Sequence, residues 1–320
     1  MDSKFMVSLI LLLSIAATKM TLSSSDGFPA AAEIHWKTIL PHTPMPAVIK
    51  QLLHLAKRGH TTAPVIVKYD RNTTYRVRYR NVTSVKQTDA TLFFLEDDLK
   101  RPGKRMLIRL TKRITDSAAF LPLKEAKSIP FSTADLPNTL TRFSIKPKSK
   151  LAFLMQETLQ LCEAPPLKSE EKHCATSLES MVDFAVSELG TNKGIRAMAT
   201  VIEDRKATET EKNSPDKWYK WYTVAGTAKE VSDAKAKTLN CHPQTFAYLT
   251  YYCHSIAGTR TYVVPFIGDD GTKAEVVAVC HTDTSEWDPK YIAFQMLHVK
   301  PGTVPICHIL VADTIVWMTI

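Results

Sequence analysis

Four cysteine–histidine dipeptides in the last quarter of the chain constrain its fold more than any other feature. They are Cys241-His242, Cys253-His254, Cys280-His281 and Cys307-His308. Ten residues separate the first two pairs, and twenty-five separate each later pair from the one before it. Because cysteine forms disulfides or binds metal, while histidine titrates or binds metal, this regular pattern indicates a structured site.

The N-terminus bears on how these cysteines are interpreted. Residues 5–17 form an apolar run behind Lys4, and the run ends in the small residues Ala16 and Ala17. Such a run is typical of a cleavable secretory signal and is too short to span a bilayer. The alternative is a buried N-terminal strand. No later stretch contains eighteen consecutive apolar residues, so we expect no transmembrane segment.

In an oxidising compartment six cysteines indicate three disulfides, whereas in the cytosol the same Cys/His mixture would indicate zinc. The predicted signal favours disulfides. Cys162 and Cys174 are twelve residues apart and make a plausible third bridge, beside bridges among the cysteines of the Cys-His pairs, although the connectivity stays open. Sequons at Asn72 and Asn81 fit a secreted glycoprotein.

Strand geometry predicts a division of labour within each Cys-His pair. Neighbouring residues of a strand point to opposite faces, so the cysteine can face a core while its histidine faces a cleft or a second layer. Four strands side by side would then carry a cysteine face and a histidine face. The alternative is four structural, hydrogen-bonded histidines.

A cluster of neutral imidazoles without thiolates suits copper, zinc or nickel. The candidate ligands are His242, His254, His281 and His308. Asp283, two residues after His281, is a candidate for orienting an imidazole, or else a turn residue. The spacing is compatible with one metal site or two.

The sequence predicts an α+β fold with a β-rich C-terminal domain and a short helical segment near the N-terminus. We divide the chain into a signal (1–17), a linker (18–32), an N-terminal segment with a helix (33–60), a strand-like connection (61–90) and the C-terminal domain (91–320).

Several elements can be placed within these segments. In the N-terminal segment, Thr43 is the expected N-cap of a helix with an apolar face. That face comprises Val48, Ile49, Leu52, Leu53 and Ala56. A capping box at 176–179 opens another helix that ends at Gly190.

Strand patterns dominate after residue 240. Residues 261–267 and 274–279 read as a hairpin joined by Asp269-Asp270-Gly271. Residues 304–306 and 309–320 read as the final strands. Earlier in the chain, residues 74–82 alternate as a strand with arginines on one face, and adjacent Glu170 and Glu171 read as solvated.

The net charge of +9 is unevenly placed, since residues 100–150 hold thirteen Lys/Arg against three Asp/Glu. In a secreted protein such a basic run points to an acidic polysaccharide or another anionic surface, and nucleic acid is not an expected partner. The alternative is a solvated basic face. No phosphate-binding glycine loop, His-Glu-x-x-His or Gly-x-Ser-x-Gly motif occurs in the sequence.

The Cys-His series, together with several shorter motifs, resembles the BURP domain of plant secreted proteins. The motifs are Phe93-Phe94 with Asp98-Leu99, Phe120-Leu121-Pro122, residues 128–132, 142–144, Cys162-Glu163, 171–181 and 301–308, with Trp317. Trp36 to Pro46 is similar to the segment that follows the signal in many members. The family includes dehydration-responsive, seed and pollen proteins, a non-catalytic polygalacturonase subunit and copper-dependent peptide cyclases. The resemblance implies copper held by the four histidines, with the cysteines in disulfides.

The resemblance implies a secreted protein of the cell wall or a secretory-pathway vacuole, related to stress or development. The alternative that it implies is an oxidative peptide cyclase. Self-modifying members carry a core peptide ending in Trp or Tyr, but before Trp218 this chain has only Trp36 and three tyrosines, at 69, 75 and 79. We therefore expect a cyclase to act on a separate peptide, and the expected partners are acidic wall polysaccharide or such a peptide.

Overall fold

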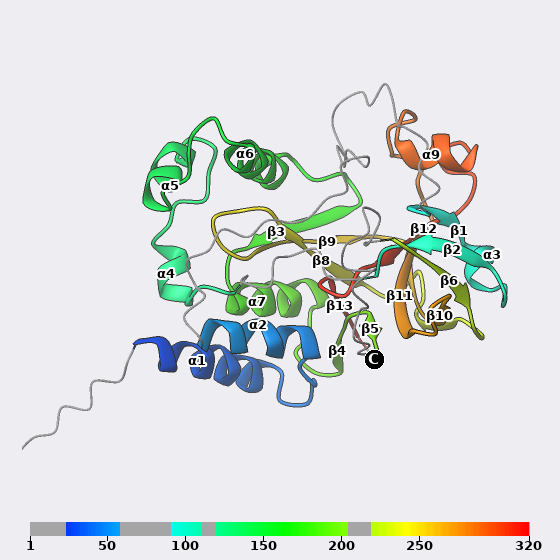
Figure 1. Ribbon diagram of the computed structural model, residues 1–320, viewed down its shortest axis with the longest axis horizontal. Helices are drawn as coiled ribbons and strands as arrows, with labels where there is room; N and C mark the ends of the chain where they lie inside the picture. The colour runs from blue at the N-terminus through cyan, green and yellow to red at the C-terminus, as the bar shows by residue number, and fades with distance from the viewer. Residues whose placement is uncertain (1–23, 58–90, 111–118, 204–218, 320) are drawn as a thin grey trace, which may run out of the picture.

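The computed structural model describes residues 24–57, 91–110, 119–203 and 219–319, and the fold is α+β with two antiparallel sheets (Figure 1). This confirms the predicted fold class. The predicted signal, the arginine-bearing strand at 74–82 and the sequons at Asn72 and Asn81 lie outside the described residues.

The larger sheet has eight strands and is antiparallel throughout. Its main path runs β1-β12-β11-β10-β6-β2, while β5 pairs with β11 and β7 pairs with β10. The strands are β1 (Phe94–Leu95), β2 (Arg105–Ile108), β5 (Val201–Ile202), β6 (Lys220–Val224), β7 (Lys229–Ser232), β10 (Thr259–Gly268), β11 (Lys273–His281) and β12 (Ile306–Leu310).

The smaller sheet has five strands in the order β3-β9-β8-β13-β4. They are β3 (Glu170–Ala175), β4 (Ile195–Met198), β8 (Thr238–Gln244), β9 (Thr250–Ile256) and β13 (Ile315–Thr319). The last two strands of the chain therefore belong to different sheets, β12 to the larger and β13 to the smaller.

Three helices cover one face of the five-stranded sheet (Figure 1). They are α1 (Ser24–Ile39), α2 (Ala47–Lys57) and α7 (Leu178–Leu189). Trp36 of α1 lies 5.2 Å, ring centre to ring centre, from Trp317 of β13, and both are almost completely buried. The N-terminal helices are therefore part of the core of the domain.

The opposite face of the five-stranded sheet packs against the eight-stranded sheet. Val277, Val279 and Leu310 of the larger sheet contact Val316 and Met318 of the smaller one. The eight-stranded sheet encloses a second core on its other face. That core includes Met106, Tyr222, Val264, Phe266, Cys280 and Cys307. Alternate residues of β11 thus serve two different cores, as a strand with both faces buried requires.

A separate lobe, here called the α4–α6 lobe, comprises residues 119–163 with α4 (Leu123–Lys127), α5 (Leu136–Arg142) and α6 (Lys150–Glu163). Its small core packs against Phe246, Ala247 and Tyr248, which lie between β8 and β9. Ser149 caps α6 by accepting a hydrogen bond from the Ala152 amide. Two short helices, α3 (Glu96–Leu99) and α9 (Ile292–Leu297), lie at the opposite end of the molecule (Figure 1).

The N-terminal helices differ in part from the prediction. Helix α1 begins at Ser24, so the described part of the expected linker is helical. Helix α2 buries Val48, Ile49, Leu52 and Leu53, as predicted. Its expected cap, Thr43, instead donates to the Ile195 carbonyl at 2.7 Å, because the tertiary packing offers this buried hydroxyl an acceptor on β4.

The C-terminal elements follow the prediction more closely. Gly190 ends α7 in the left-handed conformation, and the box that opens α7 is formed by Ser177 and Ser180, one residue after the predicted positions. The β10–β11 hairpin turns at Gly271, with φ 81°. The division between the final strands was wrong, because Cys307 and His308 lie inside β12 and the break falls at residues 311–314.

Candidate metal centre

All six cysteines form disulfides, which confirms the prediction of three bridges. Cys162–Cys174 joins α6 to β3, Cys241–Cys253 joins β8 to β9, and Cys280–Cys307 joins β11 to β12. In the two bridges made by the Cys-His pairs, the cysteines are directly opposite each other across neighbouring antiparallel strands. No thiolate is left among these cysteines to compete with the histidines for a metal.

This pairing fixes where the histidines go. His242 is opposite Tyr252, and His254 is opposite Asn240, so the two histidines lie diagonally across the Cys241–Cys253 bridge on one face of the sheet. The same relation holds for His281 and His308 about the Cys280–Cys307 bridge. A Cys-His pair on each of two antiparallel strands therefore produces a histidine pair on the face away from the disulfide.

The two histidine pairs meet because the two sheets face each other. The ring centres of His254 and His242 are 5.3 Å apart, those of His242 and His308 6.3 Å, and those of His308 and His281 5.6 Å. The expectation of four strands side by side was wrong, since the strands belong to two sheets. The cysteines point into separate cores, and the histidines line the space between the sheets.

A buried carboxylate orients one of these imidazoles. His254 Nδ1 lies 3.0 Å from Glu170 Oε1, and the Tyr252 hydroxyl donates to the same oxygen at 2.8 Å. The Glu170 side chain is fully buried. A carboxylate in this position accepts the Nδ1 proton of His254, which leaves the lone pair of the neutral ring on Nε2.

In His281 and His308, as in His254, the Nδ1 atom faces a hydrogen-bond acceptor. The Thr259 hydroxyl donates to the Ile256 carbonyl at 2.8 Å, so it can only accept from His281 Nδ1, which lies 3.1 Å away. His308 Nδ1 lies 3.4 Å from the Ile309 carbonyl. In three of the four rings, the protein thus favours the tautomer whose Nε2 is the metal ligand.

The Nε2 atoms of His242 and His254 lie 3.3 Å apart and face each other. With the His254 proton on Nδ1, a hydrogen bond between these atoms requires a proton on His242 Nε2. A metal ion can replace that proton, because two imidazoles bound at about 2.0–2.1 Å in tetrahedral geometry have nitrogens about 3.4 Å apart. The donor set therefore fits a metal that prefers neutral nitrogen ligands.

The geometry fits two metal ligands, the Nε2 atoms of His242 and His254. Within the described ranges, no group of three His, Cys, Asp or Glu side chains is close enough to hold a metal ion. The four rings follow one another in the order His254, His242, His308 and His281, and this series is here called the histidine row. His308 and His281 are therefore neighbours of the two-nitrogen site and do not complete a four-ligand site.

The carboxylate partner differs from the candidate taken from the sequence. Asp283 is exposed, and hydrogen bonds from the hydroxyl of Ser285 and from its amide, the latter at 2.9 Å, lower the pKa of Asp283. This matches the alternative of a turn residue. Glu170 was expected to be solvated, but alternation along β3 places it inward and Glu171 outward. Two adjacent carboxylates in a strand cannot share one face, and this is the signal that could have identified Glu170.

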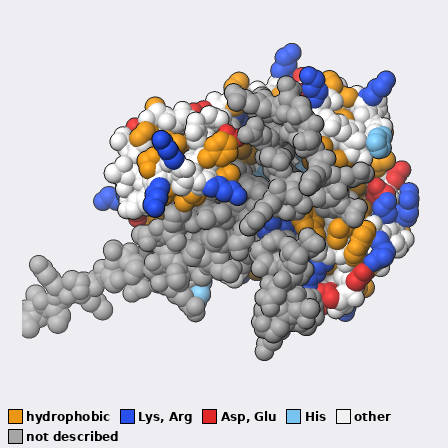
Figure 2. Space-filling view, turned by 45° about the horizontal axis from the view of Figure 1, so that its top comes forward, with side chains coloured by type: hydrophobic (Ala, Val, Ile, Leu, Met, Phe, Trp, Pro, Cys, Tyr) orange, Lys and Arg blue, Asp and Glu red, His pale blue; other side chains and the backbone are white. Residues whose placement is uncertain are grey.

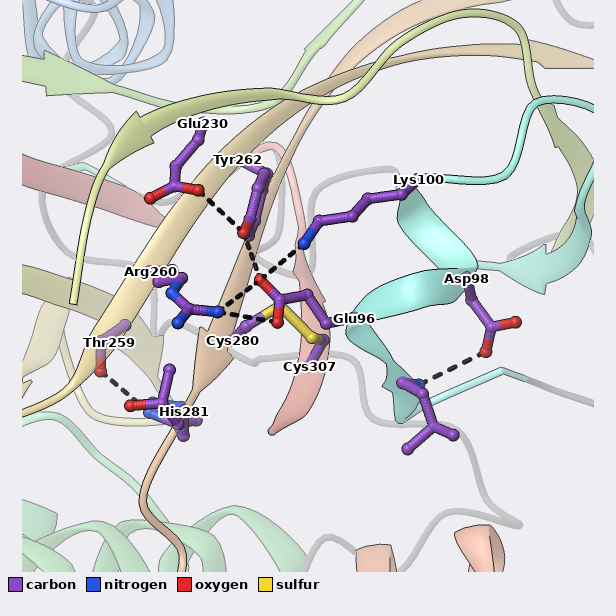
Figure 3. The surroundings of a disulfide bond; sticks show 12 residues. Glu96, Asp98, Lys100, Glu230, Thr259, Arg260, Tyr262, Cys280, His281 and Cys307 are labelled. Atoms are coloured by element: carbon purple, nitrogen blue, oxygen red, sulfur yellow. Dashed lines mark hydrogen bonds and ion pairs between the residues drawn. A yellow bond between two sulfur atoms is a disulfide. The ribbon is translucent and has the colours of Figure 1, made fainter. Parts of the chain in front are cut away.

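A second polar cluster fixes the start of the domain beside the Cys280–Cys307 bridge (Figure 3). Both carboxylate oxygens of Glu96 accept from Arg260 Nη1 at 2.9 Å, and Glu96 also accepts from the Tyr262 hydroxyl. Burial raises the pKa of Glu96, but the hydrogen bonds from Tyr262 and Arg260 outweigh it, so the pKa lies below 4.5. These contacts tie α3 to β10.

No helix in the portions of the chain that the structure describes is long and apolar enough to cross a bilayer. Three disulfides are typical of chains that fold in an oxidising compartment.

Comparison with known proteins identifies the domain that these residues form. The BURP domain matches residues 92–319. The chain is 47% identical over 230 residues to BURP domain-containing protein 3 of Oryza sativa subsp. japonica, a match that covers 72% of this chain and 51% of that protein. It is 38% identical over 322 residues to BURP domain-containing protein 5 of the same organism, covering 97% of this chain and 94% of that protein.

A third relative, BURP domain protein RD22 of Arabidopsis thaliana, is 43% identical over 233 residues, or 72% of this chain and 56% of that protein. The chain thus spans about half the length of two of these relatives and nearly all of the other. Since the matched domain covers most of the chain, this protein belongs to the BURP-domain family.

Proposed function

We propose that this protein is secreted and binds copper through the imidazoles of its Cys-His pairs. The observation that carries the proposal is the 3.3 Å separation of His242 Nε2 and His254 Nε2, combined with Nδ1 partners on three of the four rings. Copper is chosen among nitrogen-preferring metals because the family resemblance implies it. A copper ion held by His242 and His254 would supply one-electron oxidation chemistry.

The chain's own residues have defined tasks in this proposal. His242 and His254 hold the metal, and His281 and His308 lie beside them as further potential nitrogen ligands. Glu170 holds His254 in the ligand tautomer, and the two disulfides keep each histidine pair in register. His242, His254 and His308 are partly exposed, which leaves a route for solvent and small oxidants.

Metal stoichiometry tests the site. We expect the intact protein to retain copper after dialysis, and His242→Ala or His254→Ala to lose it. His42→Ala is the matched control, because His42 is exposed and lies outside the histidine row. Copper retention by both ligand variants at the level of the intact protein would overturn the site.

A second candidate function is oxidative cyclisation of a separate peptide, which the eight intact Cys and His positions favour. The test is incubation of the copper-loaded protein with peptides ending in Trp or Tyr under oxygen. Ring closure by oxidation removes two hydrogens, so the product is lighter by that mass. A peptide ending in Phe is the control, and unchanged Trp and Tyr peptides with fully loaded protein would reject the activity.

A third element of the proposal concerns an acidic polysaccharide partner. The basic run of residues 100–150 is divided in space. Lys100, Lys104 and Arg105 are paired with acidic groups near α3 and β2, at the end of the molecule opposite the α4–α6 lobe (Figure 1). The lobe carries exposed lysines, seen as blue side chains at the upper left of Figure 2. They are Lys124, Lys127, Lys146, Lys148 and Lys150.

These lysines are the better candidates for an anionic polymer, since none of them forms an ion pair within the described residues and their charge is not offset locally. Replacing Lys146, Lys148 and Lys150 by Gln should weaken binding to pectate and reduce its salt dependence. Replacing Lys100, Lys104 and Arg105 by Gln removes the same charge from the other end and should have a smaller effect, because these three side chains are already paired with acidic groups. Equal effects of the two triple variants would reject the lobe as the binding surface.

A further inference from the structure

The imidazoles of His281 and His308 belong to a closed circuit of five rings. The circuit joins β11 and β12 to the segment that precedes α9. The ring-centre distances around it are His281–Trp287 5.2 Å, Trp287–Tyr291 5.2 Å, Tyr291–Phe93 5.6 Å, Phe93–His308 6.4 Å and His308–His281 5.6 Å. The rings meet mainly edge to face, an arrangement that aromatic side chains favour.

This circuit leads from the interior to the surface. His281 is only 3% exposed, whereas Trp287 and Tyr291 are partly exposed. Phe93, the fifth member, is buried and has a side chain that resists oxidation. Trp287 is thus a readily oxidised side chain in ring contact with His281, and Tyr291 is the next one along the circuit. Tyr252 contacts His254 at 5.1 Å between ring centres, but unlike Trp287 it is buried.

We propose that Trp287 is an oxidative modification site of this protein. Its indole is the side chain that is oxidised when an oxidant reacts at the histidine row. The inference rests on the proposed copper site and names hydrogen peroxide as the oxidant. In the net step the peroxide O–O bond breaks. One oxygen enters a C–H bond of the indole to give hydroxytryptophan, and the other leaves as water.

Tyr291 modulates this outcome. If the indole has lost one electron and its N–H proton, the Tyr291 phenol can return one electron and one proton and restore Trp287. The oxidised phenol is then at the surface, away from the imidazoles. The arrangement diverts oxidation from His281 and His308 to a side chain that binds no metal.

The chain contains an internal control for this inference. Trp221 on β6 is 40% exposed, more than Trp287, and its ring is covered by the Arg105 guanidinium at 5.0 Å. No ring contact joins Trp221 to a histidine within the described residues. Oxidation that follows solvent exposure should favour Trp221, whereas oxidation directed from the histidine row should favour Trp287.

The test loads the full-length protein with one equivalent of Cu(II), adds limiting hydrogen peroxide and maps the gain of one oxygen atom by peptide mass spectrometry. We expect modification of Trp287 to exceed that of Trp221 by severalfold with copper, and to lose this preference when the metal is removed by a chelator. Copper content is measured on the same sample. Bound copper with Trp221 modified as much as Trp287 would overturn this inference alone, while absence of bound copper would overturn the proposed function and the inference with it.

Two conservative variants test the order of the residues. Tyr291→Phe keeps the ring packing but removes the returning electron, so the yield of hydroxylated Trp287 should rise. Trp221→Phe is the matched control and should leave that yield unchanged. An unchanged yield in Tyr291→Phe would show that Tyr291 does not act on Trp287.

Discussion

His254 and Glu170 are joined from Nδ1 to Oε1 at 3.0 Å, although they lie 84 positions apart in the chain. The pairing of β3 with β9 brings them together, and burial of the carboxylate makes the contact persistent. Because the imidazole can bind a metal only through its other nitrogen, this one contact sets both the ring orientation and the tautomer of His254.

Glu170→Gln should lower copper affinity by about 10–100-fold without loss of the fold, because it removes the charged acceptor that orients His254. Glu171→Gln is the matched control. The Glu171 side chain is next in sequence but exposed, so its replacement should leave the copper affinity unchanged. Titration of copper followed by the d–d absorption spectrum measures both affinity and ligand geometry. Identical affinity and spectrum in Glu170→Gln and the intact protein would rule out this role.

The disulfides allow a matched comparison, because Cys162–Cys174 and Cys241–Cys253 each close a separation of twelve residues. Removing either bridge by a double Cys→Ala change should lower the free energy of unfolding by about 3 kcal/mol. Only loss of Cys241–Cys253 should also weaken copper binding, since only that bridge lies between His242 and His254. Urea unfolding and metal titration measure the two effects, and equal loss of copper affinity in both variants would contradict the prediction.

Trp36→Ala should destabilise the whole domain by about 3–5 kcal/mol, because Trp36 is 2% exposed and packs against Trp317 in the core under the five-stranded sheet. The control is Ile34→Ala on the same helix, where the side chain is 63% exposed and the cost should be below about 0.5 kcal/mol. Thermal and urea unfolding measure the difference. Equal stability of the two variants would mean that α1 does not belong to the cooperative unit.

Glu96→Gln should lower the free energy of unfolding at neutral pH by about 1.5–3 kcal/mol, through loss of the charged hydrogen bonds from Arg260 and Tyr262. The folded-state pKa of Glu96 lies below 4.5, so its stabilisation is fully present above that pH. It is lost as the pH falls through the folded-state pKa. The difference between the intact protein and Glu96→Gln should therefore shrink in acid.

Urea unfolding at neutral pH and at several pH values below 4.5 checks this dependence. Arg105→Gln is the control, because the Arg105–Asp269 pair is more than half exposed on both sides and should contribute less than about 1 kcal/mol. A difference for Glu96→Gln that grows as the pH falls would have the wrong sign for a depressed carboxyl pKa.

Much of the local structure could be predicted because short-range signals specify it. The apolar face of α2, the glycine that ends α7 and the Asp-Asp-Gly turn of the β10–β11 hairpin each depend on residues close in sequence. The errors arose where distant partners compete. Thr43 contacts β4 instead of capping α2, and Cys307-His308 continues β12 because β11 pairs with it.

The sequence by itself determined the division within each Cys-His pair, because adjacent strand residues must face opposite ways, and the predicted secretory signal favoured disulfides over zinc. It also placed the chain in its family through the spacing of those pairs. Only the tertiary structure decided that the four histidines come from two sheets, that Glu170 holds His254, and that Trp287 contacts His281. Sheet pairing and sheet packing bring together residues remote in sequence, and no local pattern encodes those distances.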